Sequence, residues 1–314
     1  MAIEVFEDKL RLSTANKAQL ATIASIIDEY TNEGYRLTLR QLYYQLVSRD
    51  IIPNQQKEYA KLSNLLVKGR MAGIIDWDSI EDRIRIPYIP YYAENISDAL
   101  SDLIRQYRLD RQQGQNRYIE LWVEKDALSG VLKPLTSHYH IRLVVNRGYS
   151  SCTAMHDAYT RIVDACEDSD RIATIFYLGD HDPSGLDMVR DIQDRLSEFG
   201  LLNMVDVNVG DRDYSEHIPK FEVIHIGLTD EQVKKYSPPP NPAKFSDPRA
   251  KWYVQKYGKT SWEVDALNPK VLNKLIKKHV EDLIDMKLFN DQLQKEEHDK
   301  KALEEYKAQK EIEK

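Results

Sequence analysis

The stretch Tyr177-Leu178-Gly179-Asp180-His181-Asp182-Pro183-Ser184-Gly185 closes an apolar run that begins at Ile172. The run is typical of a buried strand, in which residues i and i+2 point to the same face. We therefore expect Asp180 and Asp182 to direct two carboxylates to one point at the carboxyl end of a strand, where open α/β sheets place their active sites. Such a pair suits Mg²⁺. An Asp-Pro-Ser-Gly turn explains the same residues equally well, so this stretch alone leaves both interpretations open.

A second apolar run, from Tyr118 to Val123, also ends in an acid, Glu124. Between the two runs lie a third β-like segment, 141–146, and a helical pattern over 153–166. Strands that alternate with helices predict a parallel α/β sheet. Right-handed crossovers bring the carboxyl ends of such strands to one edge. We therefore expect Glu124, Asp180 and Asp182 to share a metal ion.

These motifs resemble a known family. Glu124 followed by Asp-x-Asp-x-x-Gly at 180–185 resembles the Toprim domain, the metal-binding module of topoisomerases, bacterial primases and related nucleases. Val-Glu-Lys at 123–125, Asp-x-Asp-Pro-x-Gly and the basic-Gly pair at 147–148 are most similar to the A subunit of topoisomerase VI and its meiotic double-strand-break relatives, here in a standalone form. The resemblance implies a Rossmann-like Toprim sheet, bound Mg²⁺ or Mn²⁺, and a winged-helix domain ahead of the sheet.

In that family a winged-helix (helix-turn-helix) domain carries an Arg-Asp-x-Tyr-Tyr-type motif with the tyrosine that attacks DNA. Leu39-Arg40-Gln41-Leu42-Tyr43-Tyr44 occupies the corresponding place in chain order. The resemblance implies that Tyr44 is the nucleophile and Arg40 its helper. The sequence departs from the family at Gln41, where the family usually has an acid.

A basic segment coincides with this motif. Between residues 36 and 70 the basic residues outnumber Asp50 and Glu58 by five; they are Arg36, Arg40, Arg49, Lys57, Lys61, Lys68 and Arg70. A basic helix face that neutralises phosphates binds double-stranded DNA with a salt-dependent, mostly sequence-independent energy. A solvated helix face is the alternative. Lys125 and Arg147 are further candidates for contact with DNA from the Toprim side.

The chain divides into four predicted parts: a winged-helix domain over 1–86, a connector over 87–116, a Toprim domain over 117–268 and a charged C-terminal helix over 269–314. Within the first part we expect helices over 15–32, 38–48 and 54–71 and a wing over 74–85. The connector is expected to carry a helix over 97–113. Segments 205–209 and 221–226 are expected to be further strands. Proline excludes a helix or a central strand at 238–242, so a rigid surface arm is expected there.

Glu263 and Asp265 are two apart in Ser261-Trp262-Glu263-Val264-Asp265-Ala266-Leu267, which resembles an acidic stretch after the Toprim core of the same family. They could add a metal ligand or orient one. The alternative is that they cap a helix or lie at a strand edge.

Composition agrees with a cytoplasmic enzyme. The 314 residues suggest roughly two domains, and 42% hydrophobic residues suffice for real cores. Cys152 and Cys166 form no CxxC pair, which fits a reducing compartment. The longest apolar runs fall short of a membrane span, and the net charge of −7 gives no overall attraction to DNA.

The resemblance implies DNA cleavage by a type IIB topoisomerase-like isomerase, in which Tyr44 forms a 5′-phosphotyrosyl link while the metal site neutralises the phosphate. It also implies a homodimer, and a separate ATPase subunit because the sequence carries no P-loop. A Toprim nuclease that activates water at the same metal site is the main alternative. A DNA-binding or assembly module without catalysis is another, and a primase a weaker one.

Overall fold

The protein is a mixed α/β structure built on one parallel sheet. The computed structural model describes residues 5–6, 12–81, 89–146, 148–167, 169–207, 218–243 and 245–312. The sheet has the order β2-β1-β3-β5-β4, with all neighbours parallel; its strands are β1 (Arg117–Val123), β2 (Arg142–Val145), β3 (Ile172–Leu178), β4 (Leu202–Asn203) and β5 (Lys220–Gly227). The predicted alternation of strands and helices is thus confirmed.

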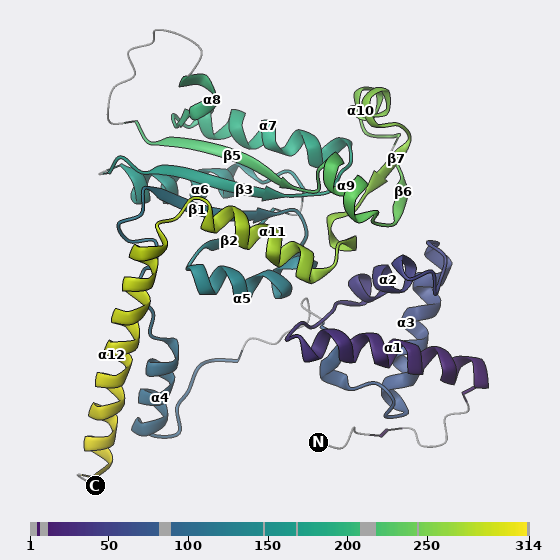
Figure 1. Cartoon of the computed structure of the whole chain (residues 1–314), viewed down its shortest axis with the longest axis horizontal. Helices are drawn as coiled ribbons and strands as arrows, with labels where there is room; N and C mark the ends of the chain where they lie inside the picture. Colours follow the sequence, from purple (N-terminus) through teal and green to yellow (C-terminus); the bar gives the residue numbers. More distant parts are fainter. Residues whose placement is uncertain are drawn as a thin grey trace.

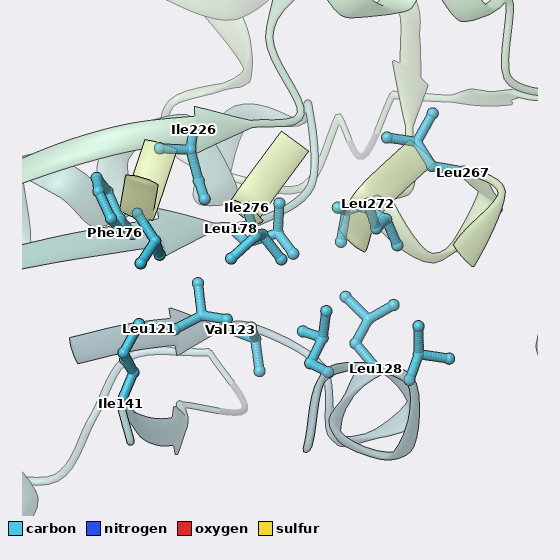
Figure 2. Close-up of a cluster of buried hydrophobic side chains, with 14 of the residues drawn as sticks. Leu121, Val123, Leu128, Ile141, Phe176, Leu178, Ile226, Leu267, Leu272 and Ile276 are labelled. Atoms are coloured by element: carbon cyan, nitrogen blue, oxygen red, sulfur yellow. The ribbon is translucent and has the colours of Figure 1, made fainter. Parts of the chain in front are cut away.

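Helices cover both faces of the sheet (Figure 1). One face packs on α5 (Ser129–Tyr139) and α11 (Pro269–Glu281), and the other on α6 (Cys152–Cys166) and α7 (Pro183–Glu198). The alternation of strand side chains explains this division. Leu121 and Val123 lie in the first core, whereas Tyr118 and Trp122 lie in the second. Figure 2 shows the first core, in which Leu178 of β3 lies beside Ile276 of α11, with Phe176 and Leu272 in the same cluster.

The N-terminal part is a helical module with its own core. Its helices are α1 (Thr14–Asn32), α2 (Leu39–Ser48) and α3 (Gln56–Met71), close to the predicted ranges. Thr38 begins α2 with a capping box: its hydroxyl accepts from Gln41 N (3.3 Å), and its N–H donates to the Gln41 side chain (2.9 Å). In the expected wing region the structure has a 3₁₀ turn, η1 (Trp77–Ser79), and a bridge between Leu37 and Ile80. Residues 82–88 lie outside the described part of the chain.

The segment after the sheet contains a small antiparallel ribbon of two strands, β6 (Pro240–Pro242) and β7 (Thr260–Trp262). The helices α9 (Asp230–Tyr236) and α10 (Ala250–Tyr257) precede the two strands, respectively, and the 3₁₀ turn η3 (Val264–Ala266) follows β7. The expected proline arm is therefore an edge strand, paired with β7 through Pro240 and Pro242. The ribbon also joins the end of β3, because His181 and Trp262 form a backbone bridge.

The predicted strand over 205–209 is wrong in the described residues. The chain forms the short strand β4 and then the helical turn α8 (Met204–Val207). Alternating valines suggested a strand, but Asn203 accepts a hydrogen bond from Val205 N (3.2 Å) and so begins a helical turn. Residues 208–217 lie outside the described part.

The predicted C-terminal helix over 269–314 is two helices. α11 belongs to the core under the sheet, whereas α12 (Met286–Ile312) extends away from the body beside α4 (Ile96–Gln106) (Figure 1). The connector helix α4 is shorter than the predicted 97–113. Among the described helices, none combines the length and apolarity that a membrane span requires.

Glu296 anchors α12 to the segment that follows α4. Its carboxylate, 4% exposed, accepts from Leu109 N (3.1 Å), Arg111 (2.9 Å) and Lys300 (2.7 Å). Burial opposes ionisation, but the hydrogen bonds from Lys300 and Arg111 prevail and lower the pKa of Glu296 to about 2. The carboxylate therefore stabilises the fold above its unfolded pKa of about 4.3, and this contribution is lost as the pH falls toward 2.

We expect Glu296→Gln to lower the free energy of unfolding by about 3 kcal/mol at pH 7, because Arg111 is left buried without its counter-charge. The difference from the wild type should shrink as the pH falls from 4.5 toward 2. Urea unfolding at several pH values measures both effects. Glu297→Gln, a neighbour with a 72% exposed side chain, is the control and should change stability by under about 0.5 kcal/mol. Equal effects of the two variants at pH 7 would contradict the prediction.

Candidate active site at the carboxyl edge of the sheet

Glu124 and Asp180 meet where β1 and β3 end. The register pairs Val123 with Leu178, and Glu124 N donates to Leu178 O (3.1 Å). The Glu124 carboxylate then accepts from the backbone N–H of Asp180 (3.0 Å). The prediction that these two strand ends share one edge is therefore confirmed.

Asp180 is a buried carboxylate, 4% exposed. One oxygen accepts from Val264 N (2.9 Å), and the other lies 2.9 Å from Lys125 Nζ. Burial raises the pKa of Asp180, against the opposing charge of Lys125. Asp180 thus links the end of β3 to Lys125 after β1 and to η3, far along the chain.

Asp182 has a different role from Asp180. Its side chain caps α7 by accepting from Gly185 N (2.7 Å) and from the Ser184 hydroxyl (2.9 Å). The glycine is required because a Cβ on Gly185 would lie 2.2 Å from Asp180 O. The turn interpretation of Asp-Pro-Ser-Gly therefore describes Asp182, and the expected convergence of both carboxylates on one point is not seen in these contacts.

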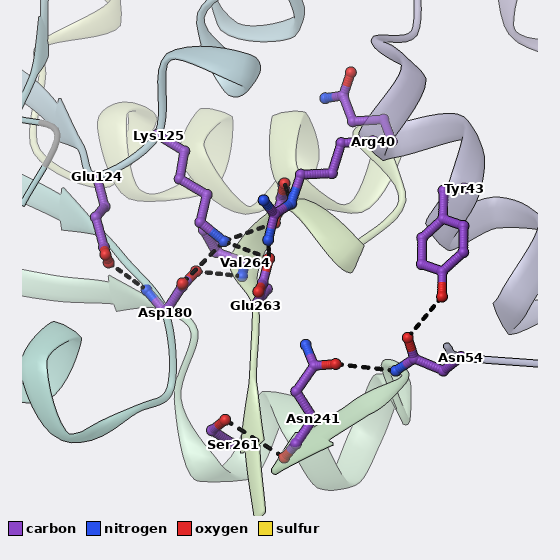
Figure 3. A network of polar contacts seen from close by, with 12 residues as sticks. Arg40, Tyr43, Asn54, Glu124, Lys125, Asp180, Asn241, Ser261, Glu263 and Val264 are labelled. Atoms are coloured by element: carbon purple, nitrogen blue, oxygen red, sulfur yellow. Dashed lines mark hydrogen bonds and ion pairs between the residues drawn. The ribbon is translucent and has the colours of Figure 1, made fainter. Parts of the chain in front are cut away.

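Glu263 and Asp265 join the site from the segment after β7. Lys125 Nζ lies 2.7 Å from Glu263 and 3.0 Å from Asp265, which is fully buried (Figure 3). Burial opposes the charge on Lys125, but Asp265, Asp180 and Glu263 raise its pKa and keep it charged. Lys125, predicted to contact DNA, is instead the central cation of three carboxylates in this structure.

Arg40 connects the N-terminal module to the same acids. Its guanidinium forms ion pairs with Glu263 and with Asp265, the latter at 3.2 Å from Nε. Burial would raise the pKa of Glu263, but Lys125 and Arg40 lower it to about 2. The predicted helper Arg40 therefore reaches the predicted acids directly, although they are more than 200 residues away in sequence (Figure 3).

Tyr44 is a buried side chain beside this cluster. It is 4% exposed, and the Arg40 guanidinium lies 5.8 Å from the centre of its ring. Burial raises the pKa of Tyr44, and the charges of Glu263 and Asp265 raise it further; Arg40 and a hydrogen bond with Asn241 oppose them. Tyr44 is therefore protonated at neutral pH in this arrangement.

Asn54 and Asn241 were not predicted, and they join the module to the ribbon. The Tyr43 hydroxyl donates to Asn54 (3.0 Å), and the Asn54 amide donates to Asn241 (3.0 Å) and to Pro240 O (2.7 Å) (Figure 3). The only sequence signal was an asparagine between prolines at 241. Gln41 is also explained: it completes the capping box of α2, so the acid expected from the family is replaced by a helix cap.

The predicted DNA-binding residues of the basic segment lie on the N-terminal module. Three have partners: Arg49 pairs with Glu29 (2.9 Å), Lys61 pairs with Glu58 (2.8 Å), and Arg70 donates to the carbonyls of Trp77 and Ile80 (both 3.1 Å). Arg36, Lys57 and Lys68 are exposed and form no ion pair with another described residue. Arg147 lies outside the described residues.

The carboxylates of the site suit a divalent cation, although the Lys125 ammonium occupies the point where three of them meet. Within the described ranges, no group of three or more His, Cys, Asp or Glu side chains is placed to hold a metal ion. The Lys125 ammonium nevertheless shows that Asp180, Glu263 and Asp265 can converge on one cation within 3.0 Å. Carboxylate oxygens are the ligands that Mg²⁺ prefers, so these residues fit the ion by their chemistry.

Comparisons with known proteins add no family. No protein-family model matches the sequence, and no curated protein matches it.

Proposed function

We propose that the protein cleaves DNA in a metal-dependent reaction in which Tyr44 attacks the phosphate, as in the A subunit of a type IIB topoisomerase. One observation carries this proposal: Tyr44 and Arg40 of the N-terminal module lie against the carboxylates at the end of the parallel sheet. A tyrosine, an arginine and an acid cluster at one edge are the groups that a phosphoryl transfer to tyrosine needs.

The Tyr44 oxygen bonds to phosphorus, the bond from phosphorus to the 3′ oxygen breaks, and the 3′ oxygen takes up a proton from solvent water. The Tyr44 proton passes to Glu263, whose charge already acts on the Tyr44 hydroxyl. Arg40 turns from Glu263 to the phosphate, which stabilises its negative charge and makes Glu263 a better proton acceptor. The products are a 5′-phosphotyrosyl link and a free 3′-hydroxyl.

Glu124, Asp180 and Asp265 would hold Mg²⁺ or Mn²⁺, while Glu263 takes the proton and Asp182 fixes the loop through its cap on α7. When bound, the ion would neutralise the scissile phosphate. Lys125 must move aside to admit it, and then becomes available to a phosphate oxygen. In the absence of substrate, the lysine keeps the carboxylates from repelling one another.

Double-stranded DNA is the proposed substrate. The exposed Arg36, Lys57 and Lys68 of the module would contact its phosphates. Cleavage of both strands requires two copies of Tyr44, hence a homodimer, and strand passage would require a separate ATPase subunit. We propose the DNA substrate, the homodimer and the ATPase subunit on one basis, the chemistry of Tyr44.

The test is a cleavage assay on supercoiled plasmid with Mg²⁺ or Mn²⁺, stopped with detergent and analysed with and without protease. We expect cut DNA that carries protein until proteolysis, and none in EDTA. Glu124→Gln should reduce cleavage at least about a hundredfold because the carboxylate that reaches Asp180 loses its charge. Cut DNA in EDTA, or unchanged cleavage by Glu124→Gln, would contradict the proposal.

A metal-dependent hydrolytic nuclease is the second candidate. It is favoured by the raised pKa of Tyr44, since a protonated phenol is a poor nucleophile. In that case the same acids activate water, and free ends appear without attached protein. The two candidates differ in their dependence on the Tyr44 hydroxyl.

A further inference from the structure

The segment around α10 has an unusual composition. Residues 249–259 contain four basic residues and three aromatic residues but no acid, in a chain of net charge −7. This is a denser basic segment than 36–70, and the proposed function does not use it.

One face of α10 is anchored in the protein. Tyr253 is fully buried, and its hydroxyl hydrogen-bonds to the carbonyl oxygens of His181 and Thr260 (both 2.8 Å). Arg249 pairs with Asp187 (2.8 Å) and Asp247 (2.9 Å). These contacts hold the helix in place. Because the charge of Arg249 is already paired, Arg249 is not counted among the cations that α10 presents to a ligand.

The other face presents an aromatic ring with cations beside it. Trp252 is 49% exposed, and Lys256 Nζ lies 5.6 Å from its ring and 5.1 Å from the ring of Tyr257. Lys251, Lys256 and Lys259 are all exposed. An acid near Lys256, Asp230, already pairs with Lys234 (2.6 Å). The surface is therefore aromatic and positive.

This surface lies next to the acid site. His181 N donates to Trp262 O (2.9 Å), and Trp262 N donates to His181 O (3.1 Å). His181 directly follows Asp180, and Trp262 directly precedes Glu263. The His181 ring packs against Tyr257, with the ring centres 4.7 Å apart. α10 thus packs on His181, whose neighbour in sequence is Asp180, and His181 is bonded to Trp262, whose neighbour in sequence is Glu263.

We propose that Trp252, Lys251, Lys256 and Lys259 bind a single-stranded segment of DNA beside the acid site. An exposed indole can stack on an unpaired base, whereas the base faces of a duplex are covered by their neighbours. The lysines neutralise the backbone phosphates of the same strand. The inference rests on the proposed function for the identity of the polymer, and it adds that DNA which is unpaired beside the acid site would be held by α10.

The test is binding of fluorescently labelled oligonucleotides, single-stranded and duplex, to the full chain in EDTA, where metal-dependent cleavage does not occur. We expect Trp252→Ala to weaken single-strand binding about tenfold, with duplex binding nearly unchanged. Trp252→Phe should restore most of the affinity. Lys256→Ala should reduce the slope of log affinity against log salt by about 0.7 for the single strand.

Tyr306→Ala and Lys301→Ala are the matched controls, since both residues are exposed on α12. Thermal unfolding verifies that each variant is folded. Unchanged single-strand binding in Trp252→Ala, or an equal loss for duplex and single strand, would overturn the inference. If the wild type fails to cleave plasmid but Trp252→Ala still loses single-strand affinity, the surface stands and the proposed catalysis is wrong.

Discussion

Tyr44→Phe is expected to reduce protein-linked cleavage of supercoiled plasmid at least about a thousandfold, because the only atom removed is the proposed nucleophile. Binding of duplex DNA should stay within about twofold of the wild type, since the ring keeps its place beside Arg40. The measurement is the amount of DNA that enters the gel only after protease treatment. Free, protein-less ends at wild-type rate in Tyr44→Phe would establish the hydrolytic nuclease instead.

Tyr43→Phe is the matched control. The Tyr43 hydroxyl donates to Asn54, and its ring contacts Tyr44 and Tyr59. Loss of that hydroxyl should lower the free energy of unfolding by about 1 kcal/mol and leave the chemistry intact. Equal loss of cleavage in both variants would mean that the two hydroxyls act through their hydrogen bonds and that Tyr44 is not a nucleophile.

Lys125→Met is expected to lower the free energy of unfolding by about 3 kcal/mol in EDTA, because three carboxylates, two of them buried, lose their central counter-ion. Mg²⁺ should restore much of this loss, since an ion that binds only the folded state stabilises it by about 2.7 kcal/mol at one hundred times its dissociation constant. The wild type should gain less from Mg²⁺, because its lysine competes for the same oxygens. Thermal and urea unfolding, with and without Mg²⁺, measure both effects.

Lys61→Met is the control for Lys125→Met. Its side chain is 69% exposed and pairs only with Glu58, so stability should change by less than about 0.5 kcal/mol. A stability of Lys125→Met in EDTA equal to that of the wild type would contradict the described role of the lysine. Loss of stability without any recovery in Mg²⁺ would contradict the metal site.

The sheet was predictable from sequence because its strands are continuous apolar runs with acids or turns at their ends. Ile172–Leu178 and Arg117–Val123 are buried on both faces, which makes their pattern strong. The segment around Val205 was mispredicted because two valines two apart resemble a strand, while the side chain of Asn203 sets the local turn. The ribbon at 240–262 depends on pairing between distant residues, which leaves little local signal.

The site was predictable in part. Glu124 and Asp180 followed from the ends of parallel strands, and Arg40 and Tyr44 from a motif. The Lys125 pairing with Asp180, Glu263 and Asp265 depends on how η3 packs under the sheet, and no spacing in the sequence encodes it. The role of Asp182 at the metal site stays a prediction, because one residue of separation fixes a shared face only while the strand continues. Here the chain has already turned into α7.

The acid site is assembled from segments that are far apart in the chain, and this has a consequence for synthesis. Asp180 follows β3, whereas its partners Glu263 and Asp265 follow β7 and are held against Lys125 across 138 and 140 positions. A nascent chain in which residues 263–265 have not yet left the ribosome therefore lacks half of these carboxylates, and a fragment cut before Glu263 lacks them permanently. The order of translation thus keeps the site incomplete until those residues have emerged, because the N-terminal module is synthesised well before the acids that contact it.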